Sequence, residues 1–394
     1  MANLLEKASI VLTPTGYSEN TIHNVKPSET PFGDMTLTNQ STTSTRVNKN
    51  GLVVNNASNI PRIDYSKGEG AILVERFSRN VVRYSENFSN ALWTKSAIDI
   101  TSSTKTNPRG VSQTIYNISR APAPGDGLFA TFAQSPSGQG TGVSIWIKRT
   151  AGTGNTGNVW IGSGKQSSGT GNTVAVGNEW QRITYTAPSY GGINIYIDPQ
   201  YGHLFDIWGA QGEYGLVSGG PGRVTSYIPN LGAGTTSRPQ DNYRDGGDAS
   251  LIGAQEGVFF FEGAALNEAN QSRGIALSAS NTRPNRVALY FRSTNGQILT
   301  IIQGSAGYIS LVASGITQTN FNKIAVKYKS GDLALWVNGV EVDTNTQSLV
   351  FNSTLNELAF DQGDNTLPFE GCIKQLAVFK EILSDAELAA LTTP

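Results

Sequence analysis

The sequence contains little charge, a single cysteine and almost no helical periodicity. Charged residues make up 15% of its 394 residues, and 29 basic side chains are balanced by 30 acidic ones. A nucleic-acid partner requires a basic face, so this balance argues against one. The lone cysteine, Cys372, excludes an internal disulfide framework, and its apolar neighbours favour a small buried side chain in a hydrophobic core.

Long apolar runs and a basic N-terminal start are also missing. Glu6 and Lys7 interrupt the apolar residues of the first eleven positions, and no small-residue cleavage site follows them. We therefore expect no signal peptide. No stretch approaches the ~20 apolar residues of a membrane-spanning helix, so membrane insertion is not expected either. Synthesis in a cytoplasm is the expectation, with release by lysis or by a dedicated route.

Small polar residues and glycine take the place of charge. The 44 glycines, together with many Ser, Thr and Asn, are typical of short strands joined by tight turns. One helix is predicted, at the C-terminus, where Ser384 and Glu387 have the spacing of a capping box ahead of an apolar run. The sequence therefore predicts an all-β protein.

The chain is long enough for two domains, and its composition predicts three parts. Residues 1–80 form an extended or β N-terminal segment for anchoring and oligomerisation, since 28–59 has too few large apolar residues to fold alone. Strand-like runs recur over 81–243 and again over 244–394, which predicts two β-sandwiches in tandem. Between them, apolar periodicity disappears near 231–247.

The clearest local pattern is a three-stranded meander in the third part. Apolar residues alternate over 324–328 and again over 333–337, with Ser-Gly-Asp at 330–332 as the turn. Asn338-Gly339 then leads into 340–342. Asn-Gly between alternating apolar runs predicts a type I′ turn, because both residues tolerate positive φ.

Three runs in the third part have a recognisable order and spacing. They are Leu-Trp-Val-Asn-Gly-Val-Glu-Val at 335–342, Phe-Glu-Gly-Cys-Ile-Lys-Gln-Leu-Ala-Val-Phe at 369–379, and Leu-Ser-Asp-Ala-Glu-Leu at 383–388. Together they resemble laminin-G-like domains of the concanavalin A-like lectin/glucanase class. The resemblance extends over about 257–392 and implies a jelly-roll sandwich.

The second part carries runs of another kind. They are Tyr-Ser-Glu-Asn-Phe-Ser-Asn-Ala-Leu-Trp at 84–93, Ile-Trp-Gly-Ala-Gln-Gly-Glu at 207–213 and Thr-Ser-Tyr-Ile-Pro at 225–229. They resemble structural and tail-appendage proteins of tailed bacteriophages, where such runs open and close a carbohydrate-binding-module-like jelly roll. Residues 45–52 and 60–65 are similar to that family too, whereas Gly212 departs from its usual Leu. The two resemblances imply two jelly-roll β-sandwiches in a virion protein.

The sequence contains only weak signals for catalytic residues. A lectin-fold glucanase needs alternating carboxylates, typically Glu-x-Asp-x-x-Glu, on one strand. Glu341 and Asp343 come closest, but position 346 is Thr. With only His23 and His203, a catalytic triad or a histidine-rich metal centre is not expected, and a structural hydrogen bond is the favoured role of His203. We therefore expect no enzyme.

Aromatic residues on polar strand faces are the candidates for ligand binding, because aromatic rings stack on sugars. In 143–148, alternation turns Trp146 away from its apolar neighbours, so that either a neighbouring segment covers it or a ligand does. With core packing as the alternative for each, the candidates are Trp146, Trp160 and Trp336, on or near polar strand faces, and Tyr190, Tyr196 and Tyr201, which cluster around a glycine-rich turn. Trp93, Trp180 and Trp208 lie in or near the family motifs and are expected to define the fold.

One oxygen-rich run suggests a cofactor. Asp361-Gln-Gly-Asp364-Asn offers the carboxylate oxygens that Ca²⁺ prefers, so Asp361 and Asp364 are candidate calcium ligands. A solvated turn explains the same run. No other cofactor is expected.

The resemblances favour a phage virion protein, in a tail or capsid appendage or fibre, that displays lectin-like domains. Its expected partners are other virion proteins, host-surface glycans and further copies of itself. Two alternatives stay open. One is a polysaccharide depolymerase, and the other is an architectural decoration protein that binds only protein.

Overall fold

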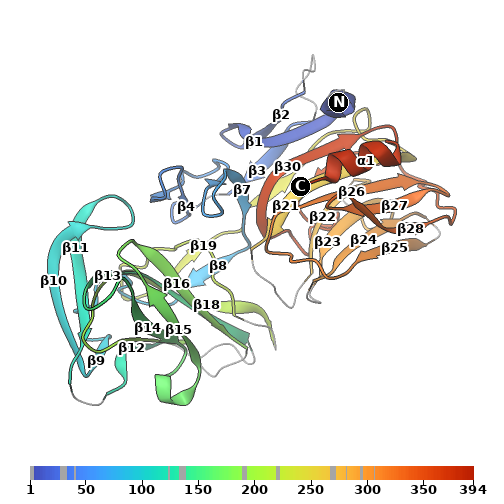
Figure 1. Cartoon of the computed structure of the whole chain (residues 1–394). Coiled ribbons are helices and arrows are strands. Elements are labelled where there is room, and N and C mark those ends of the chain that lie inside the picture. Colours follow the sequence, from blue (N-terminus) through green and yellow to red (C-terminus); the bar gives the residue numbers. More distant parts are fainter. Residues whose placement is uncertain are drawn as a thin grey trace. The chain divides into compact units, whose positions relative to one another are not determined.

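The computed structural model describes residues 4–26, 33–39, 41–122, 125–132, 139–188, 193–218, 222–266, 272–280, 282–292, 296–305 and 307–394 (Figure 1). The chain forms two compact units. Unit 1 contains residues 1–41, 57–76 and 239–394, and unit 2 contains 42–56 and 77–238. Strands dominate both units, so the all-β prediction is confirmed.

Unit 1 is built on two antiparallel sheets. In the larger one, neighbouring strands follow the order β20 (Asn242–Arg244), β3 (Met35–Thr38), β2 (Thr21–Asn24), β1 (Ile10–Ser18), β30 (Gly371–Phe379), β21 (Glu256–Ala265), β26 (Asn322–Lys329), β27 (Leu333–Val337) and β28 (Val340–Asn345). Strand β7 (Ala71–Val74) also pairs with β30, and β6 (Ile63–Asp64) pairs with β7. The smaller sheet has the order β25 (Tyr308–Ala313), β24 (Ile298–Gln303), β23 (Arg286–Phe291), β22 (Arg273–Ser278) and β29 (Glu357–Ala359).

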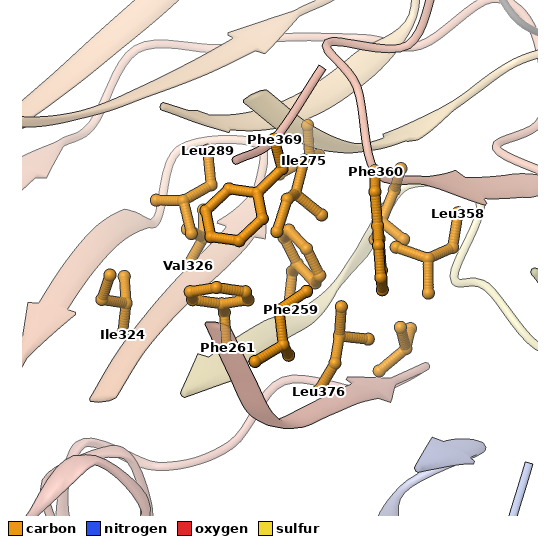
Figure 2. Close-up of a cluster of buried hydrophobic side chains, with 14 of the residues drawn as sticks. Phe259, Phe261, Ile275, Leu289, Ile324, Val326, Leu358, Phe360, Phe369 and Leu376 are labelled. Atoms are coloured by element: carbon orange, nitrogen blue, oxygen red, sulfur yellow. The ribbon is translucent and has the colours of Figure 1, made fainter. Parts of the chain in front are cut away.

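The main core of unit 1 lies between these two sheets. Figure 2 shows Phe259 and Phe261 of β21 pointing toward side chains of the smaller sheet, including Ile275 and Leu289. The ring of Phe261 meets that of Phe369 edge to face, with centroids 5.5 Å apart. Such a geometry adds about 0.5–1.5 kcal/mol to the burial of the rings.

A second apolar layer covers the opposite face of the larger sheet. Helix α1 (Asp385–Thr392) and the 3₁₀ turn η1 (Leu4–Lys7) lie beside it, and Leu388 of α1 is fully buried there. The predicted capping box is confirmed, because Ser384 and Glu387 exchange their hydrogen bonds. All five residues of β27 are consequently buried, whereas alternation alone predicts a polar face.

The predicted meander and its turn are confirmed. Strands β26, β27 and β28 pair consecutively and antiparallel. Asn338 and Gly339 both have positive φ, at 51° and 86°, as a type I′ turn requires.

Unit 2 is a sandwich of two five-stranded antiparallel sheets. One has the order β10 (Ile98–Thr106), β11 (Ser112–Arg120), β18 (Leu204–Ser218), β13 (Gln139–Ala151) and β16 (Gln181–Ala187). The other has the order β15 (Gly171–Val176), β14 (Gly157–Gly162), β17 (Ile193–Pro199), β12 (Gly127–Phe132) and β9 (Thr94–Ser96), and the short turn η2 (Gln166–Ser168) lies between β14 and β15. Two small ribbons, β4 (Thr45–Val47) with β5 (Val53–Asn55) and β8 (Ser78–Asn80) with β19 (Thr236–Arg238), complete the unit.

The described strands of residues 1–80 are divided between the units. Strands β1, β2, β3, β6 and β7 belong to unit 1, and β4, β5 and β8 to unit 2. These described strands therefore pack on the sandwiches of their own chain. Anchoring to a larger assembly stays a prediction.

Candidate ligand-binding groove

The outer face of the sheet β15-β14-β17-β12-β9 gathers aromatic and polar side chains. Along β17, Ile195 and Ile197 are buried in the core of unit 2, so the alternating residues Tyr196 and Asp198 face outward. The register pairs Asp198 with Trp160 of β14 and Tyr196 with Phe129 of β12. Four side chains from three strands thereby form one continuous surface.

Two of these side chains stack on each other. The rings of Phe129 and Tyr196 lie 4.7 Å apart at an angle of 13°. Next to Trp160, glycine keeps the surface low, since a Cβ added to Gly171 would come within 2.5 Å of the indole. The indole of Trp160 therefore lies over Gly171 and depends on the missing side chain there.

Two hollows lie along this face. The first, of about 330 Å³, is lined by Arg120, Asn158, Trp160, Gln166, Thr173, Asp198, Pro199, Gln200 and Tyr201. The second, of about 320 Å³, is lined by Arg120, Gly125, Asp126, Lys165, Gln166, Ser167 and Asp198. Because they share Arg120, Gln166 and Asp198, we treat them as one groove, called the unit 2 groove below.

The charged groups of the unit 2 groove are paired. Arg120 contacts the carboxylate of Asp198 and donates to the carbonyl of Gly125 at 2.8 Å. The ammonium of Lys165 lies 3.6 Å from Asp126. Two cations thus face two carboxylates, and the described lining carries no net charge.

The aromatic residues of the unit 2 groove differ in exposure. Trp160 is only 9% exposed, and its indole N–H donates to the carbonyl of Gly164 at 3.1 Å, so that little of its ring is available to a ligand. Tyr201, in the turn after β17, is 64% exposed. The face suited to stacking on a ligand in this groove is therefore that of Tyr201.

Polar side chains beside Tyr201 have free hydrogen-bonding groups. The side-chain oxygen of Gln200 accepts from the backbone N–H of Asn158 at 2.9 Å, which fixes the Gln200 side chain and leaves its NH₂ group free within the described structure. Sequence reasoning missed Arg120, Gln166 and Asp198. Arg120 comes from the end of β11 in the other sheet, and no local pattern places it beside β17.

The other predicted ligand-binding residues lie elsewhere. Tyr190 is outside the described residues. Trp146 is partly buried and packs on a cluster that includes Val53, Trp208 and Tyr227. Of the two alternatives for Trp146, coverage by a neighbouring segment is the one observed, since Val53 of β5 lies in that cluster.

Of the two alternatives for Trp336, core packing is the one observed. Its side chain is 7% exposed and belongs to the apolar layer that Leu388 of α1 also enters. The sequence pattern correctly placed it on the face opposite Leu335, but that face is covered by the C-terminal helix rather than by solvent.

The candidate calcium ligands are already satisfied by the protein. Asp361 accepts from the backbone N–H of Gly363 at 2.7 Å, and Arg244 lies 3.5 Å from its other oxygen. Burial raises the pKa of Asp361, and the hydrogen bonds to its carboxylate offset only part of that rise. Asp364 accepts from Thr366 and pairs with Arg283 at 2.9 Å. These contacts fit a turn, and no group of three or more His, Cys, Asp or Glu that could hold a metal occurs in the described part of the chain.

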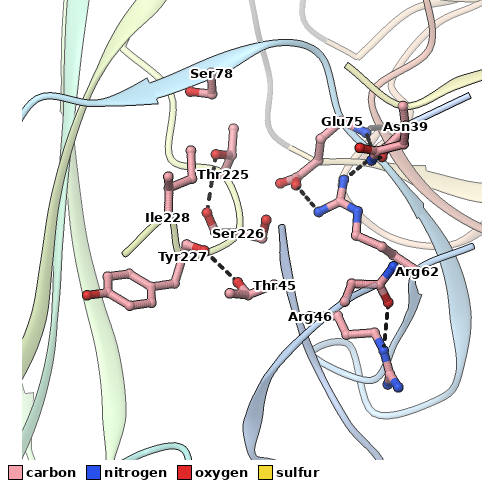
Figure 3. A network of polar contacts seen from close by, with 12 residues as sticks. Asn39, Thr45, Arg46, Arg62, Glu75, Ser78, Thr225, Ser226, Tyr227 and Ile228 are labelled. Atoms are coloured by element: carbon pink, nitrogen blue, oxygen red, sulfur yellow. Dashed lines mark hydrogen bonds and ion pairs between the residues drawn. The ribbon is translucent and has the colours of Figure 1, made fainter. Parts of the chain in front are cut away.

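The motif residues of the second resemblance hold the fold together. Glu213 is fully buried and accepts from the side chain of Gln211 at 2.6 Å and from the backbone of Thr225 at 2.8 Å. The side-chain oxygen of Gln211 accepts from the N–H of Ile228 at 2.6 Å. In Figure 3 the adjoining run Thr225 to Ile228 lies beside β4, where the hydroxyl of Thr45 donates to the carbonyl of Tyr227 at 2.6 Å.

Two smaller predictions are confirmed. His203 is buried and accepts a hydrogen bond from Arg149 at 3.3 Å, which is a structural role. Cys372 lies in the core with 1% exposure. Glu341 and Asp343 lie on β28, where Asp343 accepts from the backbone N–H of Val312 at 2.8 Å.

Comparison with known proteins supports one of the two resemblances. Residues 264–389 match the family model of the concanavalin A-like lectin/glucanases superfamily, which is less than half of the chain. This part of unit 1 is therefore similar to domains of the lectin/glucanase type. No curated protein matches the chain.

Some solved structures are weakly similar to parts of the chain. The IT-sialidase CBM40 of Ruminococcus gnavus bound to α2,3 sialyllactose is 20% identical, with a TM-score of 0.33, over 37% of this chain and 86% of that one. Domain 4 of the extracellular arabinanase AbnA of Geobacillus stearothermophilus, in complex with arabinotriose, is 14% identical, with a TM-score of 0.32, over 44% and 83%. Such values carry no argument about a ligand of this chain. None of the described helices is long and apolar enough to cross a membrane.

Proposed function

We propose that this chain is a non-enzymatic adhesion protein that binds glycans in the unit 2 groove. The observation that carries the proposal is the exposed ring of Tyr201, which lines the unit 2 groove together with the paired charges of Arg120 and Asp198. A pyranose has an apolar face and a polar rim. The groove offers a partner for each.

The roles of the groove residues follow from their chemistry. The ring of Tyr201 stacks on the C–H face of a sugar. The carboxylate of Asp198 accepts from sugar hydroxyls while Arg120 holds it in place, and the free NH₂ group of Gln200 donates. Each hollow is at the lower end of the ~300–1,000 Å³ of small-ligand pockets, which suits one or two sugar residues.

The setting proposed for this binding is the surface of a virion. The runs at 84–93 and 207–213, which resemble phage tail-appendage proteins, support this setting. The lectin-type domain of unit 1 accords with a protein that recognises carbohydrate. In this proposal the chain assembles with other virion proteins and with copies of itself, and it holds a bacterial surface glycan without cleaving it.

The test is binding of the full chain to an array of bacterial surface polysaccharides, with and without periodate oxidation of the sugars. We expect binding that periodate abolishes and that Tyr201→Ala weakens about tenfold, the loss of one aromatic contact. Tyr17→Ala is the matched control, because Tyr17 is also exposed, at 41%, but lies on β1 of unit 1.

Three outcomes would overturn the proposal. Absence of binding to every polysaccharide on the array would indicate an architectural protein that recognises protein. Release of reducing ends from the polysaccharide would indicate a depolymerase. Equal loss of binding in Tyr201→Ala and Tyr17→Ala would place the glycan outside the unit 2 groove.

A further inference from the structure

Three polar side chains of unit 1 form a chain of hydrogen bonds on strands β1 and β2 and at the start of β3. Nε2 of His23 lies 2.8 Å from the hydroxyl oxygen of Ser18, and Nδ1 of His23 lies 2.8 Å from a carboxylate oxygen of Asp34. A serine, a histidine and a carboxylate in this order are the arrangement that makes a serine a nucleophile. We propose that Ser18, His23 and Asp34 form an esterase site, which hydrolyses unhindered esters of short carboxylic acids.

The register of three neighbouring strands brings these side chains together. In β2, Ile22 is buried in the core, so the next residue, His23, faces the other side of the sheet. Continued by one residue, the register of β2 with β3 places Asp34 opposite His23. Ser18 of β1 pairs with Thr21, which shares the face of His23. The sequence, with its two histidines, does not predict a triad, and only the pairing of the strands reveals this arrangement.

The hydrogen-bond partners of the imidazole determine its role. A carboxylate only accepts hydrogen bonds, so the proton of Nδ1 lies toward Asp34. Nε2 of the neutral ring then accepts from the hydroxyl of Ser18, as a general base must. The other carboxylate oxygen of Asp34 accepts from the backbone N–H of Asn24 at 2.7 Å, which holds the carboxylate in place before any substrate arrives. Asp34 is thus a positioning residue, and Ser18 and His23 are the catalytic residues.

The turn that follows the nucleophile is held on both sides. Asn20 has a positive φ of 61°, and its N–H donates to the carbonyl of Asn59 at 2.7 Å. Its own carbonyl accepts from the N–H of Leu37 at 2.7 Å. The N–H of Glu19, the residue directly after Ser18, has no hydrogen-bond partner within the described residues, which leaves a backbone donor for the oxyanion that forms during attack.

The reaction consumes only the ester and water. His23 accepts the hydroxyl proton as the oxygen of Ser18 attacks the carbonyl carbon, and it returns that proton to the departing alcohol oxygen as the C–O bond of the ester breaks. Water then attacks the acyl group on Ser18, with His23 again accepting a proton. The carboxylic acid leaves as this proton returns to the serine oxygen, so that the products are one alcohol and one acid.

Exposure decides which esters fit the site. The side chain of His23 is 43% exposed and that of Asp34 is 23% exposed, and Ser18 is exposed as well. Such an open sheet face offers few contacts to a long acyl chain, but it admits an ester that is carried on a bulky alcohol. Short acyl groups such as acetyl are therefore the expected substrates.

This inference goes beyond the proposed function. Glycan binding in the unit 2 groove stays non-catalytic, whereas the esterase site lies in unit 1 and cuts an ester rather than a glycosidic bond. Because Ser18→Ala leaves Tyr201 unchanged, loss of ester hydrolysis and loss of glycan binding are separate results.

The test uses the full chain with two kinds of probe. A fluorophosphonate phosphonylates an activated serine with loss of fluoride, and peptide mass spectrometry locates the label. Hydrolysis of 4-nitrophenyl acetate is followed by release of 4-nitrophenolate, with 4-nitrophenyl decanoate as the long-chain comparison. We expect a single label, on Ser18, saturable hydrolysis of the acetate with an initial burst as the acyl group forms, and slower hydrolysis of the decanoate.

Three variants separate the roles of the side chains. Ser18→Ala is expected to abolish both labelling and saturable hydrolysis, and His23→Gln to lower kcat about a hundredfold, as for the loss of a general base. Asp34→Asn should lower kcat and leave KM unchanged, because Asp34 acts through His23. Ser66→Ala is the matched control, since Ser66 is also an exposed serine of unit 1, in the turn after β6.

Thermal melting checks that each variant is folded. The proposal is overturned if the label falls on another residue or on none, or if Ser18→Ala hydrolyses the acetate as fast as Ser66→Ala does. Hydrolysis of the decanoate as fast as the acetate would overturn the assignment of short acyl groups.

Discussion

The guanidinium of Arg62 donates to the carboxylate of Glu75 at 2.6 Å, and both side chains are sealed inside unit 1. A second nitrogen of Arg62 contacts the carboxylate of Asp241, which also accepts from Asn39 and from the backbone N–H of Glu75 at 2.9 Å. Figure 3 shows Arg62 and Glu75 pointing toward each other, with Asn39 nearby. Burial disfavours the charged guanidinium, but Asp241 and Glu75 outweigh burial and raise the pKa of Arg62.

This cluster joins parts of the chain that are distant in sequence. Arg62 and Glu75 flank β6 and β7, whereas Asp241 precedes β20. All three side chains are at most 2% exposed. The cluster therefore holds residues 57–76 against the segment that re-enters unit 1 near residue 239.

Replacing Arg62 by Met removes the cation that the buried carboxylates of Glu75 and Asp241 contact within unit 1. We expect the free energy of unfolding of unit 1 to fall by about 3–5 kcal/mol, as for other buried ion pairs that lose one partner. Urea denaturation measures it. The triple variant, which adds Glu75→Gln and Asp241→Asn, also removes the two carboxylate charges and is expected to recover part of the lost unfolding free energy. If Arg62→Met alone were as stable as the wild type, the cluster would contribute nothing to stability.

Truncation of the Trp336 side chain tests whether this residue contributes to core packing or to ligand binding. Trp336→Ala opens a cavity beneath α1, and we expect it to cost about 3–5 kcal/mol of unfolding free energy. Trp336→Phe keeps most of the volume and serves as the control. Binding to polysaccharide should be unchanged wherever the variant is folded; selective loss of binding without loss of stability would return Trp336 to the ligand-binding residues.

Local patterns in the sequence predicted the strands but not their distant neighbours. The meander of 324–342, the turn at Asn338-Gly339 and the C-terminal helix follow from short-range chemistry and are confirmed. The pairing of β1 with β30, at Ile10 with Val378, joins the two ends of the chain, and no periodicity encodes it.

The residues of the unit 2 groove could likewise be predicted only in part, because some of them meet through contacts between distant strands. Trp160, near a polar strand face, and Tyr201, near a glycine-rich turn, were predicted because aromatic rings stack on sugars, and both line the unit 2 groove. Arg120 and Asp198 lie on different sheets, so their meeting depends on how the sandwich closes. The covering of Trp336 by α1 depends on packing in the same way.

The contribution of Glu387, in the first turn of helix α1, to stability depends on pH. Its carboxylate contacts Lys7 and accepts from the backbone N–H of Ser384 at 3.0 Å, and these contacts, Lys7 first, lower its pKa from 4.5 to about 2. A carboxyl group with a depressed pKa in the folded state stabilises fully above its unfolded pKa. This contribution is present above about pH 4.5 and is lost as the pH falls toward 2.

Two measurements check that window. Carboxyl NMR should show Glu387 titrating well below its ordinary range, and Glu387→Gln should flatten the dependence of the melting temperature on pH in the same interval. Lys7→Met is the control, because it removes only the contact that lowers the pKa of Glu387 most. A titration midpoint near 4.5 in the native protein would contradict the prediction.

Cys372 provides a probe of how firmly the N-terminal residues are bound to unit 1. Burial raises the pKa of its thiol to about 12, and in β30 it lies between Leu73 of β7 and Ala264 of β21. Only the thiolate attacks a disulfide reagent. We therefore expect almost no reaction with Ellman's reagent at pH 8 in the native protein and complete reaction in urea, with Cys372→Ala as the blank.

The rate of that reaction reports which strands open. If β7 stays paired while the chain is native, labelling requires global unfolding and its rate rises as stability falls, so that Arg62→Met accelerates it. If residues 57–76 detach easily, as an anchoring segment that folds on a partner would, Cys372 reacts in the native protein and Arg62→Met changes little. Fast labelling would therefore mean that the pairing of β7 with β30 is a weak, exchangeable contact rather than part of the permanent sheet.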